Sequence, residues 1–373
     1  MKIYKNTWKK FVFLDAPLLF LGLNYVFYNA LAINELKTLL RISAILLLLV
    51  GWVLKKEYKI EKTMLVGLLF SVFALILNGT VAINFFVIMF LSICVTYPLE
   101  ALVKSAFKMN VLLVFLMLFL MKLHIVNNTG YVSSMGRLRY TLGFENPNVA
   151  ALFYSSAVYL LLVSQAKIKH VIIIISFFAA CAVYYYTDSR TSFLALLVFI
   201  FLEEIYRLLC RKDYERAKRI YGKGAIIICD TLFALNLLSV FMIDKFMRFD
   251  KLLSFRISTF SKMIADAGWR GFFFGGTYHT VDNFYYMLLF QYGIFIYLFT
   301  AVATHFAIKN MIKNEDIRYV ALLVGMLLVA MMESSLIRPE ILVTLVFWKV
   351  VLAGKTDLSK QSKYIRNTVN EKQ

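Results

Sequence analysis

Charged residues and recognisable catalytic motifs are both scarce in this sequence. Only 17% of its 373 residues are Asp, Glu, Lys or Arg, whereas 61% are hydrophobic. Average soluble proteins carry about 25% charged residues, because their surfaces face water. This composition therefore excludes an ordinary soluble enzyme. The sequence has no glycine-rich P-loop, no HExxH motif and no paired CxxC motif, so ATP hydrolysis and zinc chemistry have no support in it.

Cysteine is also rare. The four cysteines, Cys94, Cys181, Cys210 and Cys229, have no paired spacing and lie in or beside apolar segments. They predict neither a disulfide framework nor a metal site, and we expect no cofactor. Linkers rich in proline and serine are absent, as are internal repeats. We therefore expect a single transmembrane domain over residues 1–354, followed by a basic cytoplasmic tail at 355–373.

Long apolar runs dominate what is present, and the mean hydropathy is +0.73. A helix that crosses a bilayer needs roughly 20 apolar residues, and runs of that kind recur along the chain. The sequence predicts an all-α, polytopic integral membrane protein with about 12 transmembrane helices and a long, partly helical external loop. The predicted spans are 11–33, 36–54, 64–77, 81–98, 109–126, 147–163, 171–186, 191–209, 224–243, 284–307, 319–332 and 336–351.

The net charge of +19 raises the question of nucleic-acid binding. Lys and Arg, however, concentrate in the loops that lie inside the cell if the N-terminus is cytoplasmic, as the positive-inside rule requires. We interpret the charge as a determinant of topology and as an attraction for anionic membrane lipid, with no nucleic acid as partner. We expect a multi-pass protein of the cytoplasmic membrane with both termini cytoplasmic. The first apolar run is interpreted as a retained span rather than a signal peptide.

Arginines on the predicted external side depart from the positive-inside rule. Arginine binds phosphate and carboxylate groups through two parallel hydrogen bonds, which suits an anionic substrate at the membrane surface. The alternative is that these arginines form ion pairs with external acids. The arginines are Arg137, Arg139, Arg190, Arg256, Arg270 and Arg338, and the acids are Glu145, Asp188, Asp266, Glu333 and Glu340.

Arg190 lies between two apolar runs, where Thr191 and Ser192 are predicted to begin a helix. Backbone N–H groups at a helix N-terminus bind phosphate. A cation and a helix terminus at one place predict a pyrophosphate-binding position. Alternatively, Asp188 caps the helix and holds Arg190 locally.

The polar segment at about 244–283 is the predicted external catalytic loop. Its apolar residues recur at helical spacing, which argues for an ordered loop. His279 follows Gly275-Gly276 and precedes Asp282-Asn283, so an imidazole or a carboxylate there could act as general base toward a hydroxyl. The alternatives are a structural histidine and N-capping of the next span by Asp282.

Asp230 falls inside a predicted span, and Glu333 lies near the end of another. Intramembrane carboxylates are candidates for function, as in proton- or ion-coupled transporters. The sequence lacks the broken, glycine-rich half-helices that build transporter sites. A transporter or flippase is therefore the alternative from a different functional class.

Three motifs together resemble the O-antigen polymerase and ligase superfamily, specifically Wzy-type polysaccharide polymerases. Residues 139–148, RYTLGFENPN, are similar to the family's Gly-Phe-x-x-Pro-Asn entry to a span. Residues 189–194, SRTSFL, resemble its Ser-Arg-Thr-x-Phe-Leu turn, and residues 255–293 resemble its long loop and following span. The resemblance covers roughly residues 130–295, while the flanking spans match only in hydrophobicity.

The resemblance implies a metal-independent, inverting glycosyl transfer between undecaprenyl-pyrophosphate-linked oligosaccharides, with a chain-length regulator and a flippase as partners. It implies that Arg190 and Arg256 hold the donor pyrophosphate and that His279 or Asp282 is the base. In the ligase branch a histidine stands directly before the Asn, where this chain has Asp282, which favours a polymerase over a ligase. The candidate substrate-binding residues are Arg139, Asn148, Arg270, Asn283 and Arg338.

Overall fold

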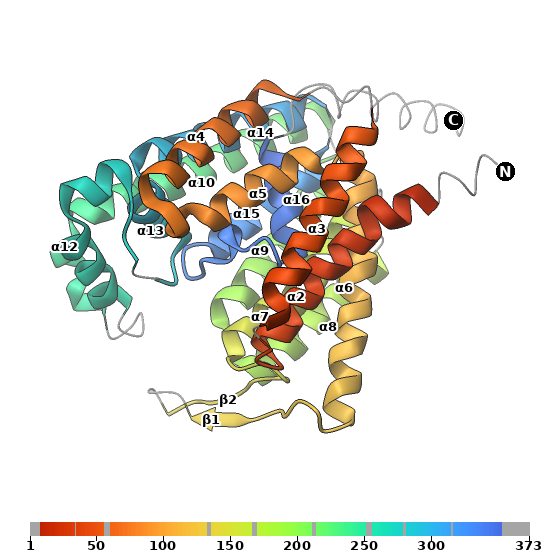
Figure 1. Ribbon diagram of the computed structural model, residues 1–373. Coiled ribbons are helices and arrows are strands. Elements are labelled where there is room, and N and C mark those ends of the chain that lie inside the picture. Colours follow the sequence, from red (N-terminus) through yellow and green to blue (C-terminus); the bar gives the residue numbers. More distant parts are fainter. Residues whose placement is uncertain are drawn as a thin grey trace. The chain divides into compact units, whose positions relative to one another are not determined.

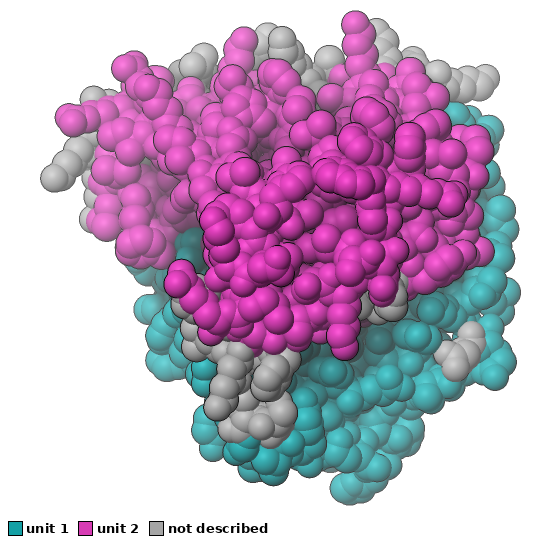
Figure 2. All heavy atoms as spheres, turned by 90° about the vertical axis from the view of Figure 1, so that its left-hand side faces the viewer, with its two compact units in different colours: residues 1–59, 91–200, 339–346 teal, residues 60–90, 201–338, 347–373 magenta. Residues whose placement is uncertain are grey.

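The computed structural model describes residues 8–33, 35–55, 60–132, 136–165, 170–210, 214–250, 256–278, 281–314 and 316–352. The described residues are helical apart from one short β-hairpin and the turns between elements (Figure 1). The chain divides into two compact units, which Figure 2 distinguishes by colour. Unit 1 consists of residues 1–59, 91–200 and 339–346, and unit 2 of residues 60–90, 201–338 and 347–373. The predicted tail at 355–373 lies outside the described residues.

Among the described residues, 8 helical segments are long and apolar enough to cross a membrane. This confirms the prediction of an all-α membrane protein, and the number of 12 spans stays a prediction. The segments are Trp8–Asn29, Glu35–Leu54, Lys62–Cys94, Leu99–Lys122, Pro147–Ser164, His170–Thr187, Tyr214–Phe241 and Ile294–Lys313.

Three further predicted spans are helices that fall outside this group. Helix α9 (Arg190–Cys210) includes Glu203 and Glu204 within its apolar run. Helices α15 (Ile317–Val329) and α16 (Leu342–Leu352) have 13 and 11 residues. Helices of that length are shorter than a bilayer is thick and are typical of buried cores. The side chains of α15 are almost entirely buried, in agreement with that assignment.

Unit 1 is a bundle in which α7 is central. It contains a π-helical turn (Phe11–Asp15), α2 (Ala16–Asn29), α3 (Glu35–Leu54), α6 (Leu99–Lys122), α7 (Pro147–Ser164) and α8 (His170–Thr187). Helix α2 packs on α3 and α6, and α7 packs on α6 and α8. Asn110 of α6 donates to Ser156 of α7 at 2.8 Å. Small residues on α7 allow this close approach between helices.

The loop between α6 and α7 forms a two-stranded antiparallel hairpin, β1 (Gly130–Val132) and β2 (Leu138–Tyr140), in which Tyr131 pairs with Arg139. This hairpin is the exception to the all-α prediction. Asn146 caps α7 by accepting a hydrogen bond from the backbone N–H of Asn148 at 2.8 Å. Pro147 is the first helical residue, where its missing N–H costs nothing.

Unit 2 is built around α10, α14 and α15, which pack against one another. Its elements are α4 (Lys62–Asn78), a 3-10 turn (Gly79–Ala82), most of α5 (Ile83–Cys94), α10 (Tyr214–Phe241), α11 (Ile243–Phe246), a 3-10 turn (Met247–Phe249), α12 (Arg256–Phe274), α13 (Phe284–Met287), a π-helical turn (Leu288–Tyr292), α14 (Ile294–Lys313), α15 and a 3-10 turn (Ser335–Ile337). Buried aromatic rings connect these elements, with Phe85 stacked on Tyr292 at 5.1 Å.

The predicted span at 284–307 is not one continuous helix. It begins as α13, passes through the π-helical turn and is interrupted at Gly293, whose φ is +94°. A Cβ at Gly293 would lie 2.5 Å from the Phe273 carbonyl oxygen. The close packing against α12 and the positive φ therefore both require glycine at this position.

The chain turns at Asn78 and Gly79, between the predicted spans 64–77 and 81–98. Helix α4 ends at Asn78, and Gly79 takes φ +56°. Glycine adopts this left-handed region without the clash that a Cβ brings. The apolar stretch from Lys62 to Cys94 is therefore broken near its middle.

Candidate functional site

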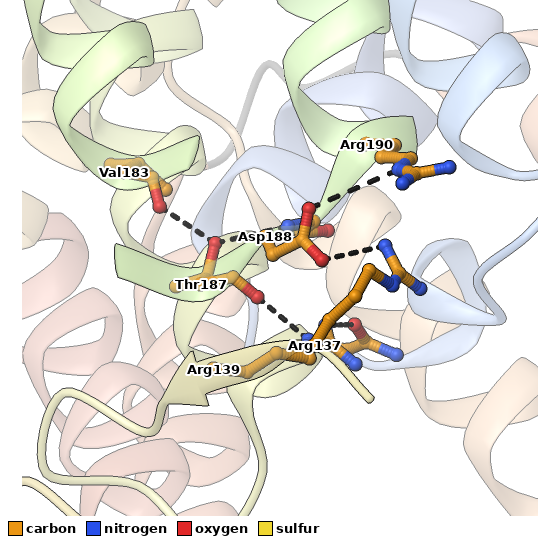
Figure 3. A network of polar contacts seen from close by, with 8 residues as sticks. Arg137, Arg139, Val183, Thr187, Asp188 and Arg190 are labelled. Carbon is orange, nitrogen blue, oxygen red and sulfur yellow. Dashed lines mark hydrogen bonds and ion pairs between the residues drawn. The ribbon is translucent and has the colours of Figure 1, made fainter. Parts of the chain in front are cut away.

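Two guanidinium groups converge on one carboxylate at the junction of α8 and α9 in unit 1 (Figure 3). Arg137 Nη1 lies 2.6 Å from Asp188 Oδ2, and Arg190 Nε lies 3.9 Å from Asp188 Oδ1. The side chain of Arg190 is 64% exposed, whereas that of Asp188 is 18% exposed. Two positive charges and one negative charge leave a net charge of +1 on these three side chains. Arg190 is the more exposed of the two cations, and its contact with Asp188 is the longer one.

The break between the two helices positions this cluster. Helix α8 ends at Thr187, whose hydroxyl donates to the Val183 carbonyl at 2.7 Å. Asp188 takes φ +46°, a left-handed conformation that Asp tolerates better than most residues. Helix α9 then begins at Arg190, one residue before the predicted start at Thr191. Ser189 Oγ donates to Ser192 Oγ at 3.2 Å and steadies this first turn.

Arg139 and Asn148, both predicted to bind substrate, form a hydrogen bond with each other. Arg139 Nε donates to the Thr187 carbonyl at 2.8 Å, and its Nη2 donates to Asn148 Oδ1 at 2.5 Å. Arg139 is only 9% exposed. These bonds connect β2, α7 and the end of α8, and Figure 3 shows Arg139 reaching the Thr187 carbonyl next to the cluster.

In unit 2, Arg256 begins α12 and contacts two groups. Its Nη1 donates to the Met332 carbonyl at 2.6 Å, and its Nη2 lies 3.9 Å from Asp282 Oδ2. The Asp282 side chain is 55% exposed, so its carboxylate remains accessible. This fits the prediction that the two residues share a site. His279 lies outside the described residues.

Asn283, another predicted substrate ligand, is 3% exposed and fully engaged within the protein. Its amide nitrogen donates to the Met331 carbonyl at 2.9 Å and to Asn236 Oδ1 at 3.2 Å. Its amide oxygen accepts from the Tyr286 N–H at 2.9 Å and so caps α13. The capping role considered for Asp282 therefore belongs to Asn283. A signal was available in the sequence, because Asn is among the preferred N-cap residues.

A polar pocket of about 640 Å³ lies beside the second half of α12. Its volume is within the range of ligand-binding pockets. Arg270 and Asp266 line it, so the structure brings one predicted substrate ligand to a cavity. The lining residues are Leu77, Asn78, Gly79, Asp266, Ala267, Arg270, Gly271, Gly275, Gly276, Thr277 and Tyr278.

Gly275 and Gly276 line this pocket, and we call this segment the glycine floor. The N–H groups of Gly276 and Thr277 donate to the Gln291 and Phe290 carbonyls, both at 3.1 Å. These carbonyls end the π-helical turn and lack partners within a helix, so the glycine segment satisfies them. A Cβ at Gly275, whose φ is +80°, would lie 2.4 Å from the Gln291 carbonyl oxygen.

Asn78 is the pocket residue that sequence reasoning missed. Its amide donates to the Phe274 carbonyl at 2.7 Å and thereby connects the ends of α4 and α12. The Asn-Gly pair indicated a turn, but no local pattern indicates what a turn will contact. Only the packing of α4 on α14 and the π-helical turn brings Asn78 to the pocket.

The other candidate residues named from the sequence belong neither to the cluster at Asp188 nor to the pocket lining. Arg338 is half-buried, and Glu340, one of its predicted counter-ions, pairs with Arg41. Asp230 forms an ion pair with His305 at 2.9 Å. Among the described residues, no group of three or more His, Cys, Asp or Glu side chains could hold a metal ion.

Comparison of the chain with models of known protein families, with characterised proteins and with solved structures found no match. The functional assignment therefore depends on the residues themselves.

Proposed function

We propose that the protein is a membrane glycosyltransferase that polymerises undecaprenyl-pyrophosphate-linked oligosaccharide repeat units. The product would be a capsular polysaccharide, an exopolysaccharide or O-antigen, assembled at the external face of the cytoplasmic membrane. The proposal combines the motif resemblance with two local structures, the arginine cluster at Asp188 and the pocket beside α12.

The observation that carries the proposal is the surplus positive charge at the start of α9. Asp188 accepts Arg137 at 2.6 Å, which leaves the exposed Arg190 only distantly paired at 3.9 Å. A guanidinium in this state can exchange a weak carboxylate contact for two hydrogen bonds to a phosphate. The first N–H groups of α9 add donors for the same anion.

Transfer of a sugar requires little further chemistry from the protein. The acceptor hydroxyl oxygen attacks the anomeric carbon, the bond from that carbon to the diphosphate oxygen breaks, and the lipid diphosphate leaves with the electron pair. Cations placed beforehand at the diphosphate stabilise the charge that develops on it. We assign this role to Arg190, and the same role for Arg256 stays a prediction from the motif resemblance.

A general base must take the proton of the acceptor hydroxyl. Asp282 is a candidate because its carboxylate is exposed and Arg256 is its only charged neighbour among the described ion pairs. His279 remains the other candidate. The pocket lined by Asn78, Asp266 and Arg270 offers the amide, carboxylate and guanidinium groups that hydrogen-bond to sugar hydroxyls, and we assign it to the glycan.

Asp230, the acid inside a predicted span, gives little support to the alternative of a transporter or flippase. Asp230 was its main candidate, yet this side chain is 47% exposed and already paired with His305. A carboxylate on a central transport pathway would be enclosed by protein. A ligase would use the same donor chemistry with a different acceptor, so the acceptor distinguishes it.

The test uses purified protein in liposomes with lipid-linked repeat units, and the measurement is the length distribution of the glycan. We expect Arg190→Ala and Arg256→Ala each to slow chain growth by about 100-fold, the usual effect of removing one group that stabilises a transition-state anion. Arg219→Ala is the matched control, because Arg219 is an exposed arginine in the basic first part of α10. Normal polymer from both variants would refute the mechanism.

The same assay separates the alternatives. Polymer that appears only when a foreign acceptor lipid is added indicates a ligase. Repeat units that cross the bilayer without elongation indicate a flippase. Either result would replace the polymerase assignment.

A further inference from the structure

Two charged residues of α12 do not pair with each other, because a glycine breaks the helix between them. Asp266 and Arg270 are four residues apart, and an acid and a base at that spacing are neighbours on a regular helix. Gly268 lies between them with φ +54°, outside the helical region. No ion pair joins the two side chains, although both line the pocket beside α12.

The break leaves the guanidinium group of Arg270 available. Its side chain forms no hydrogen bond or ion pair with any residue that the structure describes, whereas Asp266 already has an interaction partner within the chain. A guanidinium carries five N–H donors in a planar fork, which suits two parallel hydrogen bonds to a carboxylate or a phosphate. The pocket therefore offers one unused cation to the molecule that occupies it.

Two uncharged groups in the same pocket are also unused. Asn78 donates its amide nitrogen to the Phe274 carbonyl at 2.7 Å, but its Oδ1 accepts no hydrogen bond from the described part of the chain. This oxygen lies 2.9 Å from the point where a Cβ of Gly276 would be, so glycine leaves room beside it. The hydroxyl of Thr277, likewise, forms no hydrogen bond with a described residue. An amide oxygen and a hydroxyl can both bond to the hydroxyl groups of a sugar.

We propose that this pocket binds an acidic sugar, that is, a monosaccharide unit that bears a carboxylate or a phosphate. The anionic group accepts hydrogen bonds from Arg270, and the sugar hydroxyls bond to Asn78 Oδ1 and to the Thr277 hydroxyl. A neutral sugar leaves the guanidinium without an anion, and a small inorganic anion fills little of a pocket of about 640 Å³. The inference rests on the proposed function, because it takes the ligand to be one residue of the repeat unit.

The test measures binding rather than polymerisation. The full chain in lipid nanodiscs is titrated with methyl glucuronoside, with its uncharged methyl ester and with methyl glucoside 6-phosphate, and ligand-observed NMR gives each Kd. We expect at least one of the charged sugars to bind about tenfold more tightly than the ester, the order of one charge-assisted hydrogen bond. The tighter of the two charged sugars identifies the anionic group.

Three variants locate the charge that is responsible. Arg270→Gln should abolish the preference for charged sugars and leave the unfolding temperature unchanged, because this side chain has no partner among the described residues to lose. Asp266→Asn should strengthen the binding of charged sugars by about threefold, because the Asp266 carboxylate lines the same pocket and repels an anion. Arg219→Gln is the matched control and should change no affinity, since Arg219 is exposed on α10.

Two results would overturn the inference: equal affinity of the wild-type protein for the ester and both charged sugars, or a charge preference that survives in Arg270→Gln. The polymer assay can fail separately. A charge preference without polymer growth contradicts the proposed reaction alone, and polymer growth without a charge preference contradicts this inference alone.

Discussion

The side-chain amide of Asn78 donates to the backbone carbonyl of Phe274 at 2.7 Å, and this bond joins two helix ends that are far apart in sequence. Carbonyl groups in the last turn of a helix lack partners within it, so Asn78 satisfies one that α12 leaves open. The same amide lies 3.4 Å from the Gln291 carbonyl. The turn after α4 thereby becomes one wall of the pocket that we assign to the glycan.

Removing this amide should loosen the pocket. We expect Asn78→Ala to lower the free energy of unfolding by about 0.5–1.5 kcal/mol, because the Phe274 carbonyl loses an exposed hydrogen bond. Thermal unfolding in detergent measures this change. Thr80→Ala, an exposed substitution two residues further along, should leave the unfolding temperature unchanged. Equal unfolding temperatures for the two variants would show that Asn78 does not stabilise the end of α12.

The conformation of the glycine floor gives a second prediction. Gly275→Ala should destabilise the protein by more than about 2 kcal/mol, because it adds a Cβ that meets backbone atoms to the strain of a positive φ. Gly268→Ala provides the comparison, since Gly268 also has a positive φ, of +54°, but open space around it. Chemical unfolding of both variants separates steric clash from φ strain. A larger loss in Gly268→Ala would contradict the packing described for the floor.

Arg139 offers a test of structural against substrate-binding arginines. We expect Arg139→Lys to lower stability by about 1–3 kcal/mol, because one ammonium cannot reach both the Thr187 carbonyl and Asn148 in the geometry of a guanidinium. Arg190→Lys, at an exposed position, should leave stability unchanged and reduce the rate of chain growth. Thermal unfolding and the polymer assay measure the two effects. An Arg139→Lys variant that is stable but inactive would indicate that Arg139 binds substrate.

The net charge of the side chains around Asp188 gives a fourth prediction. Arg137→Gln changes the net charge of Arg137, Asp188 and Arg190 from +1 to 0, and it frees Asp188 to pair with Arg190. We therefore expect weaker binding of inorganic diphosphate in calorimetry at low salt. The double variant Arg137→Gln/Asp188→Asn returns the charge to +1.

The double variant should recover much of the diphosphate affinity, because Asn tolerates the left-handed backbone that Asp188 adopts. Affinity in the wild-type protein should fall as salt screens the exposed Arg190. Loss of binding in Arg137→Gln that the second substitution does not recover would mean that Arg137 contacts the anion directly.

The sequence by itself determined the class of the protein and several local features. Apolar runs long enough for a bilayer predicted helices that cross a membrane, because such runs are stable only in lipid or deep inside protein. The break between the predicted spans 64–77 and 81–98 and the start of α7 at Pro147 were predicted correctly, and α9 begins one residue before its predicted start at Thr191. Each of these depends on the backbone preferences of one or two adjacent residues.

The tertiary structure alone decided which polar groups are already occupied. Arg139 and Asn283 donate to carbonyl groups that are distant in sequence, and Asn148 accepts from Arg139. The residue types and their positions in the sequence could not reveal these partners. The interruption at Gly293 and the role of Asn78 likewise depend on carbonyl groups of other helices. A hydrogen bond between distant segments is set by how helices pack, and the order of residues along one helix does not encode its partner.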